Sequence, residues 1–104
     1  MTKVIEHKGL TSKQIVDMNK EFTFFSWSIQ DQVDPIPVVK AEGVYFWDAG
    51  GKRYLDFASQ LVNTNIGHQH PKVVKAIQDQ AAHLTFVAPG MASEPRGLLG
   101  KKLA

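Results

Sequence analysis

Apolar residues along the chain fall into separate runs, and the spacing within each run predicts an element. The first run has its apolar side chains three or four residues apart: Ile15, Met18 and Phe22. This spacing predicts an amphipathic helix over residues 12–21. Thr11 stands at the N-cap position and Gln14 follows three residues later, which is the spacing of a capping box. We expect the apolar face of this helix to lie against another apolar surface.

Residues 43–71 begin with a different pattern, in which aromatic and β-branched residues gather at 44–47 and again at 53–57. Such runs are typical of strands on a half-buried sheet. The residues between them, 48–52, start with Asp and contain a pair of glycines, a composition that favours a tight turn. Together with a short strand over residues 38–41, this hairpin predicts a three-stranded antiparallel meander.

Both faces of the predicted hairpin carry large apolar groups. Alternation places Val44 and Phe46 on one face and Tyr45 and Trp47 on the other. We therefore expect the hairpin to be covered on both sides. A chain of 104 residues, of which 10% are aromatic, has little further apolar surface to supply that cover.

The last third of the chain returns to helical spacing. Pro71 is predicted to be the first residue of a helix over residues 71–83, because the missing N–H of proline costs nothing at that position. Ser93 is a candidate cap for a final helix. The chain stops at Ala104 within the apolar stripe of that helix and without a capping glycine, so we expect that the polypeptide has been cut short.

Charge and composition narrow the class of protein. Lys and Arg number 12 against 10 Asp and Glu, and no basic run is longer than a pair, which argues against nucleic acid as the main partner. The absence of cysteine excludes a disulfide framework and suits a reducing compartment. No stretch resembles a signal peptide, and no apolar run approaches the roughly 20 residues that span a bilayer. We expect a cytoplasmic protein that does not enter the membrane.

Two stretches are candidates for binding a ligand. Trp27 lies in the aromatic segment 23–32, with a serine on either side. This segment is either a buried connection under the first helix or the aromatic wall of a pocket. Residues 58–67 mix small, amide and hydroxyl groups, which is the composition either of a ligand-facing loop or of a well-satisfied structural turn.

Residues that could carry catalysis or hold a metal are scarce. His68 and His70 could share a metal on a strand, but no cysteine or nearby carboxylate accompanies them as a further ligand, so we do not expect a metal site. The glycine spacings match no phosphate-binding loop, and no GxSxG or HExxH motif is present. The residues alone indicate an α+β segment with one pocket-like region and no catalytic centre.

Several motifs, taken in order, resemble one known family. They lie at residues 43–48, 51–57, 65–71 and 76–80. Their order and spacing, with the Gly-His-x-His-Pro element at residues 67–71, resemble the N-terminal region of the class III aminotransferases. These are the ω-amino acid aminotransferases that use pyridoxal 5'-phosphate (PLP). The resemblance covers residues 22–104.

The resemblance implies an α+β fold that forms the N-terminal segment of an aspartate-aminotransferase-like, fold type I PLP enzyme. Residues 1–104 would belong to the small domain and run up to the start of the missing large PLP-binding domain. The enzyme would be a homodimer that acts on a small-molecule amine and a 2-oxo acid. The lysine that holds PLP, the acidic partner of its pyridine nitrogen and the phosphate-binding turn would lie in the large domain, so none of the ten lysines here is assigned as catalytic or cofactor-binding.

By the same resemblance, the substrate pocket would be lined by Trp27, Leu61, Val62 and Phe86. Residues 86–91 would approach the active site of the partner subunit. Ser59 and Gln60 stand where many relatives carry smaller residues, and this departure bears on the shape of the loop.

Two functions from different classes remain open at this stage. The first is the N-terminal part of a class III aminotransferase, which transfers an amino group between an amine or ω-amino acid and a 2-oxo acid and is inactive as this segment alone. The second is a free-standing interaction module that uses the exposed hairpin as a docking surface.

Overall fold

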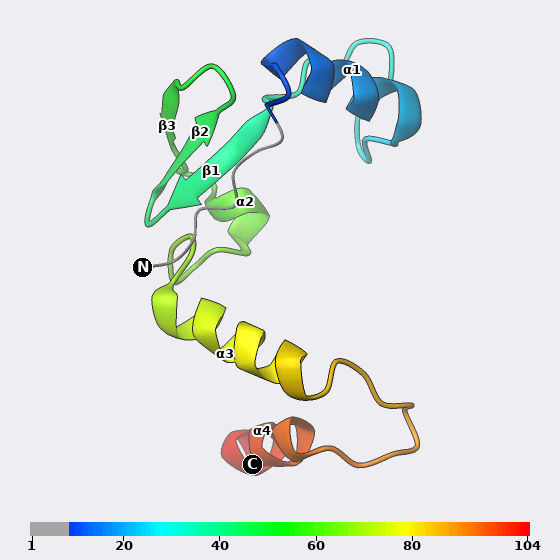
Figure 1. Ribbon diagram of the computed structural model, residues 1–104, viewed down its shortest axis with the longest axis vertical. Helices are drawn as coiled ribbons and strands as arrows, with labels where there is room; N and C mark the ends of the chain where they lie inside the picture. The colour runs from blue at the N-terminus through cyan, green and yellow to red at the C-terminus, as the bar shows by residue number, and fades with distance from the viewer. Residues whose placement is uncertain (1–8) are drawn as a thin grey trace. The chain divides into compact units, whose positions relative to one another are not determined.

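The computed structural model describes residues 9–104, which divide after His70 into two units (Figure 1). The first unit contains a helix, a three-stranded sheet and a short helical turn: α1 (Ser12–Phe22), β1 (Val38–Glu42), β2 (Tyr45–Asp48), β3 (Arg53–Leu55) and α2 (Ser59–Val62). The second unit contains α3 (Pro71–His83) and α4 (Glu94–Leu103). The predicted α+β order of helix, meander and further helices is confirmed, with α2 as an addition.

Helix α1 starts with the capping box that its sequence predicts. The backbone N–H of Gln14 donates to Oγ1 of Thr11 over 3.3 Å, and the N–H of Thr11 donates back to Oε1 of Gln14 over 2.9 Å. Both bonds satisfy donors that the first helical turn leaves without a partner. The helix ends at Phe22, where the N–H of Thr23 bonds the carbonyl of Asn19.

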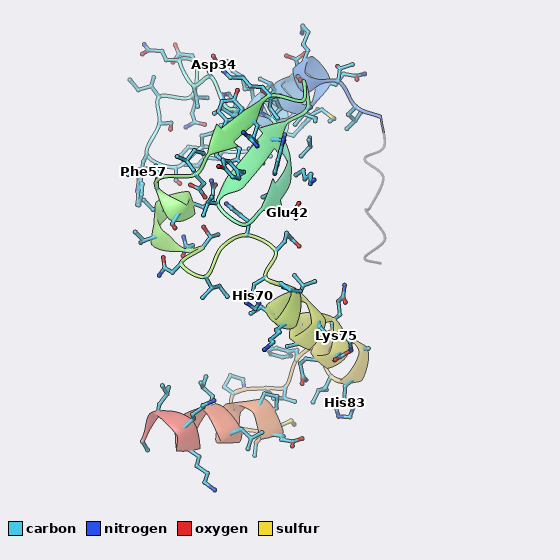
Figure 2. The ribbon with its side chains drawn as sticks, turned by 90° about the vertical axis from the view of Figure 1, so that its left-hand side faces the viewer. Asp34, Glu42, Phe57, His70, Lys75 and His83 are labelled. Carbon is cyan, nitrogen blue, oxygen red and sulfur yellow. The ribbon has the colours of Figure 1, made fainter. Side chains whose placement is uncertain are left out.

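The sheet is an antiparallel meander in the order β1-β2-β3. Its central pairs place Phe46 opposite Tyr54 and Trp47 opposite Arg53. Strand β3 is shorter than predicted, because its pairing with β2 ends at Leu55 and the chain then leaves the sheet towards α2. Phe57, predicted to close the last strand, is outside it and 95% exposed (Figure 2).

The turn between β2 and β3 is organised by one carboxylate. Oδ1 of Asp48 accepts the N–H groups of Gly50 and Lys52, each over 2.9 Å, and Oδ2 accepts the hydroxyl of Tyr54 over 2.9 Å. Gly51 takes the positive φ of 85° that the turn requires. The predicted role of Asp48 as the first residue of the turn is confirmed.

The same hydrogen bonds set the acidity of this carboxyl group. The bond from the Lys52 backbone, assisted by those from Tyr54 and Gly50, outweighs the effect of burial and lowers the pKa of Asp48 below its ordinary value of 3.8. A lowered pKa stabilises the folded turn at pH values above 3.8, and this stabilisation is lost as the pH falls through the lower folded value.

We therefore expect the Asp48 carboxyl carbon to titrate below pH 3.8 in an NMR titration of the folded protein. Asp48→Asn should remove this acid-dependent part of the stability and weaken the turn at neutral pH, because an amide nitrogen cannot accept the Tyr54 hydroxyl or a backbone N–H. A titration at the ordinary value would show that these bonds do not form.

Aromatic groups on both faces of the meander are only half covered. On one face the ring of Phe46 stacks on Tyr54 with centroids 5.0 Å apart. On the other face the Arg53 guanidinium lies 4.5 Å from the ring centroid of Tyr45, and the Lys40 ammonium lies 4.7 Å from that of Trp47. None of the residues in the described range 9–104 is fully buried. The described chain thus covers the hairpin in part and forms no closed hydrophobic core.

Helix α3 begins at Pro71 and ends at His83, as predicted. Helix α4 follows Ser93, which is its N-cap, as predicted, and has the extended backbone of that position but makes no side-chain capping bond. A capping hydroxyl accepts from the second or third helical residue, and here the second is Pro95, which has no N–H to donate. Of the helices described, none has the length and apolar character needed to cross a membrane.

Candidate functional site

The segment between β3 and α3 is held by a shielded pair of side chains, Asp56 and His68. Nε2 of His68 lies 2.6 Å from Oδ2 of Asp56, and the two side chains are only 11% and 5% exposed. The same carboxylate accepts the backbone N–H of Gln60 over 3.2 Å and the hydroxyl of Thr64 over 3.5 Å. We call these four residues the Asp56 clasp. It joins the end of the sheet to residues four to twelve positions further along the chain.

The Asp56 carboxylate is ionised in this setting. Burial opposes its charge, but the hydrogen bonds from His68 and Gln60 outweigh burial and lower the pKa of Asp56 below its ordinary value of 3.8. The contribution of this charge to stability is therefore present above pH 3.8 and is lost only in more acidic solution.

A second connection closes the segment against the start of the hairpin. Gly43 and His68 form an isolated antiparallel bridge, with N–H to carbonyl distances of 3.1 and 2.7 Å. Gly67 precedes the bridge with φ of 85°, and a Cβ atom on it would lie 3.2 Å from the carbonyl oxygen of Gly43. A side chain would therefore be strained here both in its backbone angle and by close approach. This is the physical reason for glycine before His68.

Between these anchors the backbone makes a left-handed turn, α2. Residues 59–62 all have positive φ, with values of 51°, 46°, 60° and 58°. None is glycine, and left-handed backbone costs L-residues roughly 1–2 kcal/mol each. The turn is closed by the N–H of Asn63, which donates to the Ser59 carbonyl over 2.8 Å. Strain of this kind persists only where surrounding contacts over-determine the conformation, and the Asp56 clasp supplies those contacts.

This turn carries two of the predicted substrate-binding residues. Leu61 and Val62 are consecutive on α2 and are 62% and 74% exposed. The composition of segment 58–67 predicts either a ligand-facing loop or a structural turn, and it does not predict that the turn is left-handed. Ser59 and Gln60, the two residues at which the sequence departs from the family resemblance, both lie in this turn. The strained backbone therefore presents two aliphatic side chains away from the unit that holds it.

The other aromatic candidate, Trp27, lies at the tip of a second strained loop. Its φ is 61° and its side chain is 89% exposed, so within the described chain it is not a buried connection under α1. The side-chain amide of Gln30 crosses the base of this loop. It accepts the N–H of Phe25 over 3.0 Å and donates to the carbonyls of Phe25 and Ser28 over 2.6 and 2.9 Å.

The structure brings some predicted site residues together and leaves others apart. Leu61 and Val62 are adjacent, whereas no described contact joins them to Trp27. Phe86 belongs to the second unit, in the loop before α4, where it is 77% exposed. His68 is engaged by Asp56, and residues 9–104 contain no cluster of three groups that could hold a metal.

A groove on the first unit lies away from these residues. It has a volume of ≈ 330 Å³ and opens between α1 and residues 34–37, with the ring of Tyr54 at one side. A smaller hollow of ≈ 230 Å³ beside it reaches Phe25. Neither groove is lined by a predicted substrate-binding residue, so the candidate site rests on exposed side chains that the two strained loops present.

Comparison with known proteins gives consistent matches. The family described as aminotransferase class-III matches residues 28–104. A probable mitochondrial ornithine aminotransferase from Caenorhabditis elegans is 40% identical over 83 residues, which are 78% of this chain and 18% of that protein. The chain thus spans less than a fifth of the length of this relative.

Solved structures match over nearly the whole chain. The taurine:2-oxoglutarate aminotransferase from Bifidobacterium kashiwanohense, in complex with PLP and glutamate, is 42% identical with a TM-score of 0.85, over 93% of this chain and 22% of that one. A thermostable (S)-enantioselective ω-transaminase from Thermomicrobium roseum is 31% identical with a TM-score of 0.83, over 90% of this chain and 22% of that one.

Proposed function

Because this chain belongs to the class III aminotransferases, we propose that it forms the N-terminal part of a PLP-dependent enzyme that transfers an amino group between an amine or ω-amino acid and a 2-oxo acid. The observation that carries the proposal is the family match, which extends over residues 28–104. Residues 1–104 would form the N-terminal segment of the small domain. The comparisons give no support to a free-standing interaction module.

The exposed apolar side chains agree with a segment that packs against a larger body. Phe24 is 77% exposed, Phe57 95% and Leu103 79%. Exposed apolar groups on this scale mark surfaces that are covered in the working protein. We propose that the rest of the enzyme, and a second subunit in a homodimer, cover them.

The residues present here do not by themselves fit PLP. A lysine that holds the cofactor must be drawn out of water to lower its pKa. Every lysine in the described part of the chain is exposed, and Lys13, Lys40 and Lys75 are engaged with carboxylates on their own helix or strand. The cofactor, its lysine and the proton transfers at it would therefore belong to other parts of the complete enzyme. This segment would contribute walls to the substrate pocket.

We assign the pocket walls to Trp27, Leu61, Val62 and Phe86. Strained backbone presents the first three, and all four are more than half exposed. Residues 86–91 would approach the active site of the partner subunit. The donors named for the relatives, ornithine and taurine, share a primary amine remote from the acid group. We propose a donor of this class.

Two preparations test the proposal. The 104-residue chain is expected to bind no PLP and to give no amino transfer between an amine and pyruvate. The same segment within the complete enzyme, obtained by extending the gene beyond the codon of Ala104, should do both. Turnover by the 104-residue chain alone, or a continued reading frame without a PLP-binding lysine, would contradict it.

Trp27→Ala in the complete enzyme should change amine preference more than stability. Removing an indole wall from an apolar pocket should alter the ratio of kcat/KM for a bulky aryl amine to that for a small aliphatic amine by about tenfold or more. The melting temperature should change little, because Trp27 is 89% exposed within its own unit. A collapse of the melting temperature with unchanged preference would identify Trp27 as a core residue instead.

A further inference from the structure

The loop that carries Trp27 has a backbone conformation that its sequence does not favour. Trp27 has φ of 61°, in the left-handed region that a bulky L-residue rarely adopts, and it is 89% exposed, so burial contributes little to holding it there. Something else must therefore stabilise this arrangement. Hydrogen bonds from the Gln30 side chain at the base of the loop supply this stabilisation.

The side-chain amide of Gln30 makes the two hydrogen bonds to the backbone of Phe25 that a neighbouring β-strand would make in a sheet. Its Oε1 accepts the Phe25 N–H over 3.0 Å, and its Nε2 donates to the Phe25 carbonyl over 2.6 Å. The second hydrogen of Nε2 reaches the Ser28 carbonyl over 2.9 Å. This arrangement uses one acceptor and both donors of the amide and spans the residues on either side of Trp27.

Few side chains can make this set of contacts. Glutamate has the same shape but no donor, so it would face the carbonyl oxygens of Phe25 and Ser28 with a negative charge. Asparagine has the amide but is one methylene shorter. The amide therefore links the backbone of Phe25 to that of Ser28, and this link restricts the backbone conformation of Trp27 between them.

We propose that Gln30 is a positioning residue for substrate selection, which sets the orientation of the Trp27 indole in the amine pocket. The inference rests on the proposed function, because it takes Trp27 as a wall of that pocket. Gln30 itself does not touch the amine. Its amide holds the backbone of residues 25–28 in the form that presents the indole.

A double-mutant cycle in the complete enzyme tests this role. The measured quantity is the kcat/KM ratio for a bulky aryl amine against a small aliphatic amine. Gln30→Ala is expected to shift this ratio about tenfold, in the same direction as Trp27→Ala, and Gln30→Glu to shift it at least as far. The double variant should behave like Trp27→Ala alone, because the amide acts only through the indole.

Gln32 provides a matched control, since it lies two residues further on and its side chain makes no hydrogen bond within the described chain. Gln32→Ala and Gln32→Glu should leave the ratio unchanged. Independent, additive effects of Gln30→Ala and Trp27→Ala would overturn the positioning role. An unchanged ratio in Gln30→Ala, while Trp27→Ala shifts it, would also overturn that role and leave the pocket assignment intact. If neither variant shifts the ratio, the pocket assignment itself fails.

Discussion

Replacing Asp56 with alanine is expected to lower kcat/KM of the complete enzyme by about a hundredfold. The carboxylate is the common acceptor for His68, Gln60 and Thr64, and its side chain is only 5% exposed. Without it, three donors lose their partner and water has little access to replace it. The left-handed turn of α2 then loses the contacts that maintain it, and a displacement of about 1 Å in a substrate-positioning element can cost about this factor.

Two further variants distinguish the loss of the Asp56 clasp from a general loss of stability. Asp56→Asn keeps an acceptor for the Gln60 N–H and can still bond the imidazole, so we expect an intermediate loss of kcat/KM. Asp17→Ala is the matched control, because Asp17 is 54% exposed in an ion pair with Lys13 on the surface of α1. Such exposed pairs contribute well under about 1 kcal/mol, so activity should be unchanged. Equal activity for Asp56→Ala and Asp17→Ala would refute the clasp.

Gly67→Ala is expected to destabilise the complete enzyme by about 1–2 kcal/mol. Gly67 has φ of 85°, where an L-residue is strained, and its Cβ would lie 3.2 Å from the Gly43 carbonyl oxygen. That oxygen accepts the His68 N–H over 2.7 Å, so any movement that relieves the contact weakens the bridge beside the clasp. The loss should appear as a lower urea midpoint with an unchanged slope.

Gly97 offers the opposite case for the same substitution. It lies in the interior of α4, has no positive φ, and would place a Cβ with nothing within 4 Å. Alanine there should stabilise the helix by about 0.5–1 kcal/mol. If both variants shift the urea midpoint in the same direction, the strain assigned to Gly67 is not real.

Features determined by neighbouring residues were predictable. The Thr11 capping box, the Asp48 turn and the Pro71 helix start each involve groups within a few positions of one another, so their chemistry is readable from short stretches. The Ser93 cap shows how narrow such signals are, since Pro95 removes one of the two donors that a capping hydroxyl could use. The family resemblance, which rests on ordered motifs, is confirmed by the match over residues 28–104.

The left-handed backbone at residues 59–62 could not be read in the same way. Residues with positive φ are normally recognised in a sequence because they are glycine, whereas this run contains Ser, Gln, Leu and Val. Its local preference is overruled by hydrogen bonds to Asp56. The same holds for Trp27, whose backbone depends on the Gln30 amide. The substrate-pocket assignments remain predictions that the variants above test.

By itself, the sequence determined the family and every element except α2, in their order, because propensities, caps and turns act over a few residues. Only the tertiary structure decided that Asp56 meets His68 twelve residues away, and that Leu61, Val62 and Trp27 are presented by strained backbone. Conformations that are locally unfavourable exist only where other groups compensate them, and the fold decides which groups meet.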